Sequence, residues 1–75
     1  MEFDILCKII AEVLGVDAAE VKEDTTFMED LGADSLDLYQ ILMKVEEEFD
    51  IKISAYAIDE IVTVGQAMDL IKKMN

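Results

Sequence analysis

The sequence contains no histidine and only one cysteine, Cys7, among its 75 residues. Without histidine the most common general base is missing, so a Ser-His-Asp or Cys-His catalytic arrangement is excluded. A single cysteine cannot form an intrachain disulfide, so nothing in the chain requires an oxidising compartment. We therefore expect Cys7 to be a packing residue, and we expect the protein not to be an enzyme.

Basic residues and long apolar runs are also scarce. Six Lys and Arg stand against 18 Asp and Glu, which gives a formal net charge of -12. Such a surface repels nucleic acids and anionic membranes, and it attracts proteins that carry Lys or Arg patches. No apolar run approaches membrane-spanning length, and the first residues lack the basic and apolar parts of a secretion signal. We expect a cytoplasmic monomer with basic protein partners, without nucleic-acid binding or membrane insertion.

Proline is absent, and the chain shows no repeat and no flexible linker. A hydrophobic content of 53% argues against disorder, so residues 1–75 are expected to form one domain. Apolar residues recur at helical spacing in four segments. The first should end near Leu14, before Gly15, and the second should run from about Ser35 to Glu48. The pattern predicts an all-α four-helix bundle.

The last two helices have recognisable start signals. Ser54 can cap a short third helix, and Thr63 with Gln66 forms a capping box for the fourth. Ile51-Lys52-Ile53 alternates like a strand but is too short to build a sheet, so we expect a connector.

A long polar segment, residues 16–34, separates the first two helices. Its large apolar residues Val21, Phe27 and Leu31 are expected to hold it across the core. A short helical turn is predicted around Thr26 to Glu29.

Ser35 stands where this polar loop becomes a helix. The first turn of a helix has unpaired backbone N–H groups and the positive end of the helix dipole, so a phosphate bonded to Ser35 would find donors there. The simpler alternative is that Asp34 or Ser35 only caps the helix.

The second helix has three distinct faces. Its core side holds Leu38, Leu42, Val45 and Phe49, flanked by Ile41. Its polar side holds Asp37, Gln40, Lys44, Glu47 and Glu48. A separate apolar strip begins beside Ser35 and consists of Leu36, Tyr39 and Met43; Tyr39 could equally pack against a neighbouring element.

Two blocks carry a resemblance to a known family: Asp30-Leu31-Gly32-Ala33-Asp34-Ser35-Leu36-Asp37 and Glu46-Glu47-Glu48-Phe49-Asp50. Together with the four-helix plan, they resemble an acyl carrier protein of the bacterial fatty-acid type. The resemblance implies that Ser35 is esterified to 4'-phosphopantetheine. A separate phosphopantetheinyl transferase (holo-carrier synthase) would deliver this group from coenzyme A, and its thiol would carry acyl chains as thioesters.

The resemblance also assigns roles to other residues. Asp34 would orient Ser35 or bring a transferase-bound Mg²⁺ close, besides its possible role as N-cap; no resident metal site is expected. Enzymes of fatty-acid synthesis with basic surface patches would bind a partner face composed of Leu36, Asp37, Met43, Glu47, Glu48, Asp59 and Glu60. The acyl chain would lie in an apolar interior lined by Leu42, Val45, Phe49, Ile58, Ile61 and Met68.

Some positions depart from the family pattern and leave alternatives open. Gln40 stands where another acid is usual, Lys44 interrupts the acidic face, and residues 54–58 contain fewer acids than usual. A carrier for polyketide, peptide, D-alanine or other specialised pathways would also use a modified serine. A non-covalent acidic interaction module is a further alternative. A calcium-binding protein would also explain the charge, but the loop lacks the oxygen-ligand spacing of an EF-hand.

Overall fold

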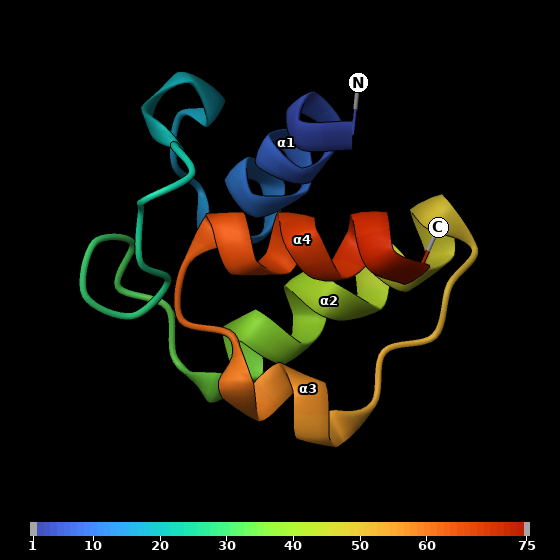
Figure 1. The fold of residues 1–75 in the computed structure, drawn as a ribbon. Helices are drawn as coiled ribbons and strands as arrows, with labels where there is room; N and C mark the ends of the chain where they lie inside the picture. The colour runs from blue at the N-terminus through green and yellow to red at the C-terminus, as the bar shows by residue number, and fades with distance from the viewer. Residues whose placement is uncertain (1, 75) are drawn as a thin grey trace.

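The structure, a computed structural model, describes residues 2–74. Within them it contains four α-helices, α1 (Glu2–Leu14), α2 (Ser35–Phe49), α3 (Ala55–Glu60) and α4 (Val64–Met74), and one 3₁₀ helix, η1 (Ala18–Glu20) (Figure 1). This confirms the predicted all-α fold with a long loop between α1 and α2 and a short third helix. No helix in the described range is long and apolar enough to cross a bilayer.

The helix ends follow local sequence signals. Gly15 ends α1 in the left-handed region at φ 70°, and its N–H donates to the Ala11 carbonyl at 2.8 Å. The Thr63 and Gln66 capping box is confirmed: the Gln66 N–H donates to Thr63 Oγ1 at 3.1 Å, and the Thr63 N–H donates to Gln66 Oε1 at 3.0 Å. Ser54 caps α3 by accepting the Ala57 N–H at 3.1 Å.

The hydrophobic core draws side chains from α1, α2, α4 and the long loop. α2 packs against α1 on one side and against α3 on another, and α1 also contacts α4. The arrangement of these helices is visible in Figure 1. The largest side chains that are fully buried are Phe27, Leu6, Ile10, Ile41, Leu42, Met68, Ile71, Val45 and Val64.

The long loop differs from the prediction in where its helical turn lies. Residues 26–29 are not helical; they belong to a turn in which the Leu31 N–H donates to the Thr26 carbonyl at 3.2 Å. The side chains of Thr26 and Asp30 close this turn reciprocally, because each accepts the other's backbone N–H, at 3.0 and 2.9 Å. The helical turn is η1 instead, and Asp17 caps it by accepting the Ala19 N–H at 3.0 Å.

The loop is attached to the core and to the connection between α3 and α4. Val21 and Phe27 are buried and Leu31 is partly buried, as predicted. The Phe27 N–H donates to the Val62 carbonyl at 3.1 Å, and the Val64 N–H donates to the Thr25 carbonyl at 2.9 Å. These two bonds flank a bridge between residues 26 and 63.

Gly65 extends this attachment into the first turn of α4. Its N–H donates to the Glu23 carbonyl at 2.8 Å, and a Cβ at position 65 would lie only 2.9 Å from that carbonyl oxygen. The close approach of the two backbones therefore requires glycine here. The Ala33 N–H donates to the Phe27 carbonyl at 2.9 Å, so the fixed loop also positions the residues just before Ser35.

Candidate functional site

The start of α2 is held by a reciprocal capping box of two aspartates. The Asp37 N–H donates to Asp34 Oδ1 at 2.9 Å, and the Asp34 N–H donates to Asp37 Oδ2 at 3.3 Å. Asp34 is therefore the N-cap, and Ser35 is the first residue of α2. Of the two capping candidates in the sequence, Asp34 performs that role, so the Ser35 hydroxyl is not needed to cap the helix.

Removing this cap should destabilise the fold. We expect Asp34→Ala to lower the free energy of unfolding by about 1 kcal/mol, because the N-terminal N–H groups of α2 lose their acceptor. Urea unfolding followed by circular dichroism measures this change. Asp24→Ala is the matched control, because it removes one negative charge from an exposed position of the same loop. Equal stability of the two variants would contradict the capping role.

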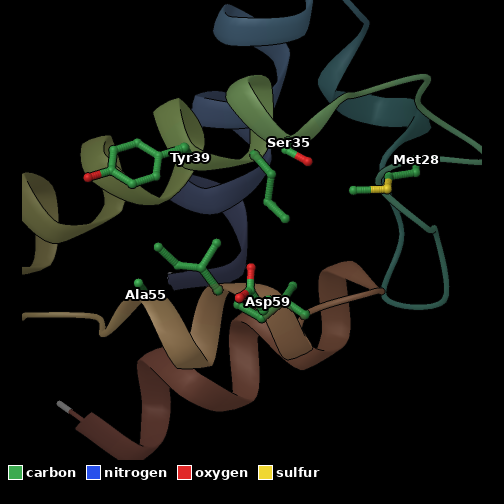
Figure 2. Close-up of a pocket in the computed structure, with 8 residues that line it drawn as sticks. Met28, Ser35, Tyr39, Ala55 and Asp59 are labelled. Carbon is green, nitrogen blue, oxygen red and sulfur yellow. The ribbon is translucent and has the colours of Figure 1, made fainter.

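Ser35 is exposed and lies on the rim of a cleft, which we call the Ser35 cleft, between α2, α3 and the long loop. The cleft has a volume of about 200 Å³. Figure 2 shows Ser35 at the start of α2, with Met28 on the loop side and Tyr39 further along α2. The Asp59 carboxylate points from α3 toward α2. The lining residues are Met28, Ser35, Leu38, Tyr39, Ala55, Ile58, Asp59 and Ile61.

The Ser35 cleft contains hydroxyl groups but few ionisable side chains. The whole sequence contains no histidine, and among residues 2–74 Asp59, on the opposite helix, is the only carboxylate that lines the cleft. Cys7 does not contribute, because it is buried in the core, where its thiol donates to the Val21 carbonyl at 3.8 Å. Burial, and secondarily the charge of Asp4, raise the pKa of the Cys7 thiol and favour its neutral form. The expectation that Cys7 is a packing residue is confirmed.

The apolar strip on α2 faces solvent. Leu36, Tyr39 and Met43 are 65%, 48% and 47% exposed. Tyr39 is therefore not packed into the core, although it lines the Ser35 cleft. An exposed apolar strip of this kind is typical of a protein contact surface.

The acidic residues predicted for partner binding occupy different environments. Glu47 and Glu48 on α2 are exposed, as are Asp59 and Glu60 on α3. Asp37 is half-buried, and its carboxylate takes part in the capping box. On the same helix, Lys44 forms an ion pair with Glu12 of α1, with the Nζ and Oε2 atoms 3.8 Å apart.

The predicted acyl-pocket residues fall into two groups. Ile58 and Ile61 line the Ser35 cleft. Leu42, Val45 and Met68 are completely buried in the core, and Phe49 is partly buried at the far end of α2. Sequence reasoning missed Met28 and Ala55 as cleft residues, because neither belongs to a helical apolar pattern that points toward Ser35.

Comparison with known proteins gives a consistent result. A family model described as "Phosphopantetheine attachment site" matches residues 4–71. The acyl carrier protein of Clostridium acetobutylicum is 43% identical over 72 residues, which cover 96% of this chain and 94% of that protein. The chain belongs to the acyl carrier protein family.

Solved structures agree with this membership. An acyl carrier protein from Thermotoga maritima matches with a TM-score of 0.84 at 33% identity, covering 99% of this chain and 91% of that one. A candidate acyl carrier protein from Mycobacterium tuberculosis matches with a TM-score of 0.92 at 30% identity, covering 97% of both chains. The cofactor of an acyl carrier protein with this attachment domain is 4'-phosphopantetheine.

Proposed function

We propose that Ser35 holds the 4'-phosphopantetheine arm, and that the arm's thiol carries acyl groups as thioesters between the enzymes of fatty-acid biosynthesis. The observation that carries this proposal is an exposed hydroxyl on the first residue of α2, beside an apolar cleft. Because Asp34 supplies the cap, the Ser35 oxygen can be esterified without loss of the capping bonds.

The start of α2 suits a phosphodiester. A phosphate on Ser35 would lie at the positive end of a helix of 15 residues, where first-turn N–H groups are oriented toward it. The protein would then supply position and recognition, while the cofactor supplies the thiol chemistry. Asp34 would act as a positioning residue, because its cap fixes the helix turn that carries the serine.

The acyl chain would enter the bundle from the Ser35 cleft. Ile58 and Ile61 already line this opening, and Leu38 forms part of its α2 wall. The deeper predicted residues Leu42, Val45, Phe49 and Met68 would contact the chain only after α2 and α3 move apart. Such opening should cost little free energy for two reasons. The core of a small domain is small, and the net charge of -12 makes the compact state repel itself.

Partner enzymes would recognise the surface around Ser35. Exposed Leu36 and Met43 offer apolar contacts, and the surrounding carboxylates attract basic patches over longer distances. Electrostatic attraction raises the association rate without requiring a large, tight interface. This suits a carrier that several enzymes must bind and release. The proposed charged contacts are Asp37, Glu47, Glu48, Asp59 and Glu60.

Incubation with coenzyme A, Mg²⁺ and a broad-specificity phosphopantetheinyl transferase tests the proposal. Mass spectrometry should show the wild-type protein gaining the mass of one arm, and peptide fragmentation should place the arm on Ser35. Attachment at Ser54, the other serine of the sequence, would refute the assignment, as would the absence of any mass gain. Acceptance of the malonyl-loaded protein by fatty-acid condensing enzymes, and not by those of a specialised pathway, tests the pathway.

A further inference from the structure

A second pocket lies between the long loop and the connection from α3 to α4. We call it the loop pocket; its volume is about 290 Å³. It shares Met28, Asp59 and Ile61 with the Ser35 cleft, so the two hollows adjoin. Its lining residues are Thr26, Met28, Glu29, Asp59, Ile61 and Val62.

Two large apolar side chains of the loop pocket are exposed. Met28 is 53% exposed and Val62 is 56% exposed, although the residues that precede them in the chain, Phe27 and Ile61, are buried. The Val62 carbonyl accepts the Phe27 N–H, and the turn that contains Met28 is closed by the bond from the Asp30 N–H to the Thr26 hydroxyl. The structure therefore presents this apolar surface in a defined arrangement, which lowers the conformational entropy lost on binding.

The charges around the loop pocket have one sign. Glu29 and Asp59 line it and are exposed, and no lysine is among its lining residues. An apolar wall next to two carboxylates complements a side chain with an aliphatic stem and a cationic head. Lys and Arg have this character.

We propose that the loop pocket receives a Lys or Arg side chain of the transferase that modifies Ser35. This inference rests on the proposed function of Ser35. The stem of the basic residue lies over Met28 and Val62, and its cationic head approaches Glu29 and Asp59. Because Figure 2 shows Ser35 between Tyr39 and Met28, an enzyme bound both to this pocket and to the α2 strip straddles the hydroxyl that it modifies.

The dissociation constant for the transferase tests the proposal. Every measurement uses full-length carrier with Ser35→Ala, so that binding is determined without any modification. The added double substitution Met28→Ser with Val62→Ser should raise Kd roughly tenfold, because it truncates the apolar wall. Glu29→Gln should raise Kd roughly threefold at low ionic strength, and this effect should vanish at high salt.

Met74→Ser is the matched control. Met74 is also partly exposed, at 45%, but it lies at the C-terminal end of α4, whereas Val62 precedes the N-terminal end of that helix. It should leave Kd unchanged. Circular dichroism should show native helicity for each variant, and Glu29→Gln provides the test if the double variant fails to fold. An unchanged Kd in the folded variants would overturn the loop-pocket proposal, as would an equal effect of Met74→Ser. Failure of the Ser35 assignment is seen separately, in the mass of the incubated wild-type protein.

Discussion

Ser35→Ala should abolish attachment of the phosphopantetheine arm, so that the variant keeps its unmodified mass after incubation with coenzyme A and the transferase. The alanine side chain has no oxygen to form the phosphodiester, so the first residue of α2 would no longer carry a hydroxyl. The variant should nevertheless fold normally. Ser35 is exposed and Asp34 provides the cap, so stability should change by no more than about 0.5 kcal/mol.

Ser54→Ala is the matched control, with the opposite pattern expected. Ser54 also stands at a helix start, but its hydroxyl accepts the Ala57 N–H at 3.1 Å and therefore caps α3. Its removal should lower stability by about 1 kcal/mol while leaving attachment intact. Mass spectrometry and thermal unfolding of both variants separate the two roles. Full modification of the Ser35→Ala protein would contradict the assignment of the attachment site.

The parts of the fold that depend on local interactions could be predicted from the sequence. Gly15 ends α1 because a left-handed residue is needed there, and Thr63 with Gln66 starts α4 because their side chains reach neighbouring backbone groups. These interactions span only a few residues. The same is true of the boundary between loop and helix at Ser35.

The loop was predicted less well because its structure depends on residues far apart in the sequence. Its hydrogen bonds from Phe27 and Val64 join it to the α3–α4 connection, and no periodic pattern signals such pairing. The turn at residues 26–31 is closed by Thr26 and Asp30, which compete with helix formation by binding backbone N–H groups. These bonds account for the non-helical backbone at residues 26–29.

The composition of the Ser35 cleft also depends on tertiary structure. Helical periodicity correctly places Leu38, Leu42 and Val45 on the core side of α2, but it does not show where along the helix the core opens. The cleft between α2 and α3 opens at Leu38, whereas Leu42 and Val45 are fully buried in the core. Met28 reaches the cleft only because the loop folds back on itself.

Phe27→Ala should be among the most destabilising single substitutions in this protein. The Phe27 side chain is 1% exposed and is the largest of the fully buried side chains, although it belongs to a loop. Truncation removes its packing and leaves a void, which typically lowers stability by about 3–5 kcal/mol. A domain of 75 residues has a total stability of roughly 4–11 kcal/mol, so a large part of it would be lost.

Thermal unfolding followed by circular dichroism should therefore show the Phe27→Ala transition at least about 12 °C below that of the wild type. Met28→Ala is the control from the adjacent position, since Met28 is 53% exposed and should change stability by only about 0.5 kcal/mol. The Phe27 carbonyl accepts the Ala33 N–H at 2.9 Å. Release of the loop would therefore also disturb the residues that precede Ser35. Slower arm attachment than in the wild type, at a temperature where both proteins remain folded, would show that the loop positions the serine. Equal melting temperatures for the two variants would show instead that Phe27 does not anchor the loop.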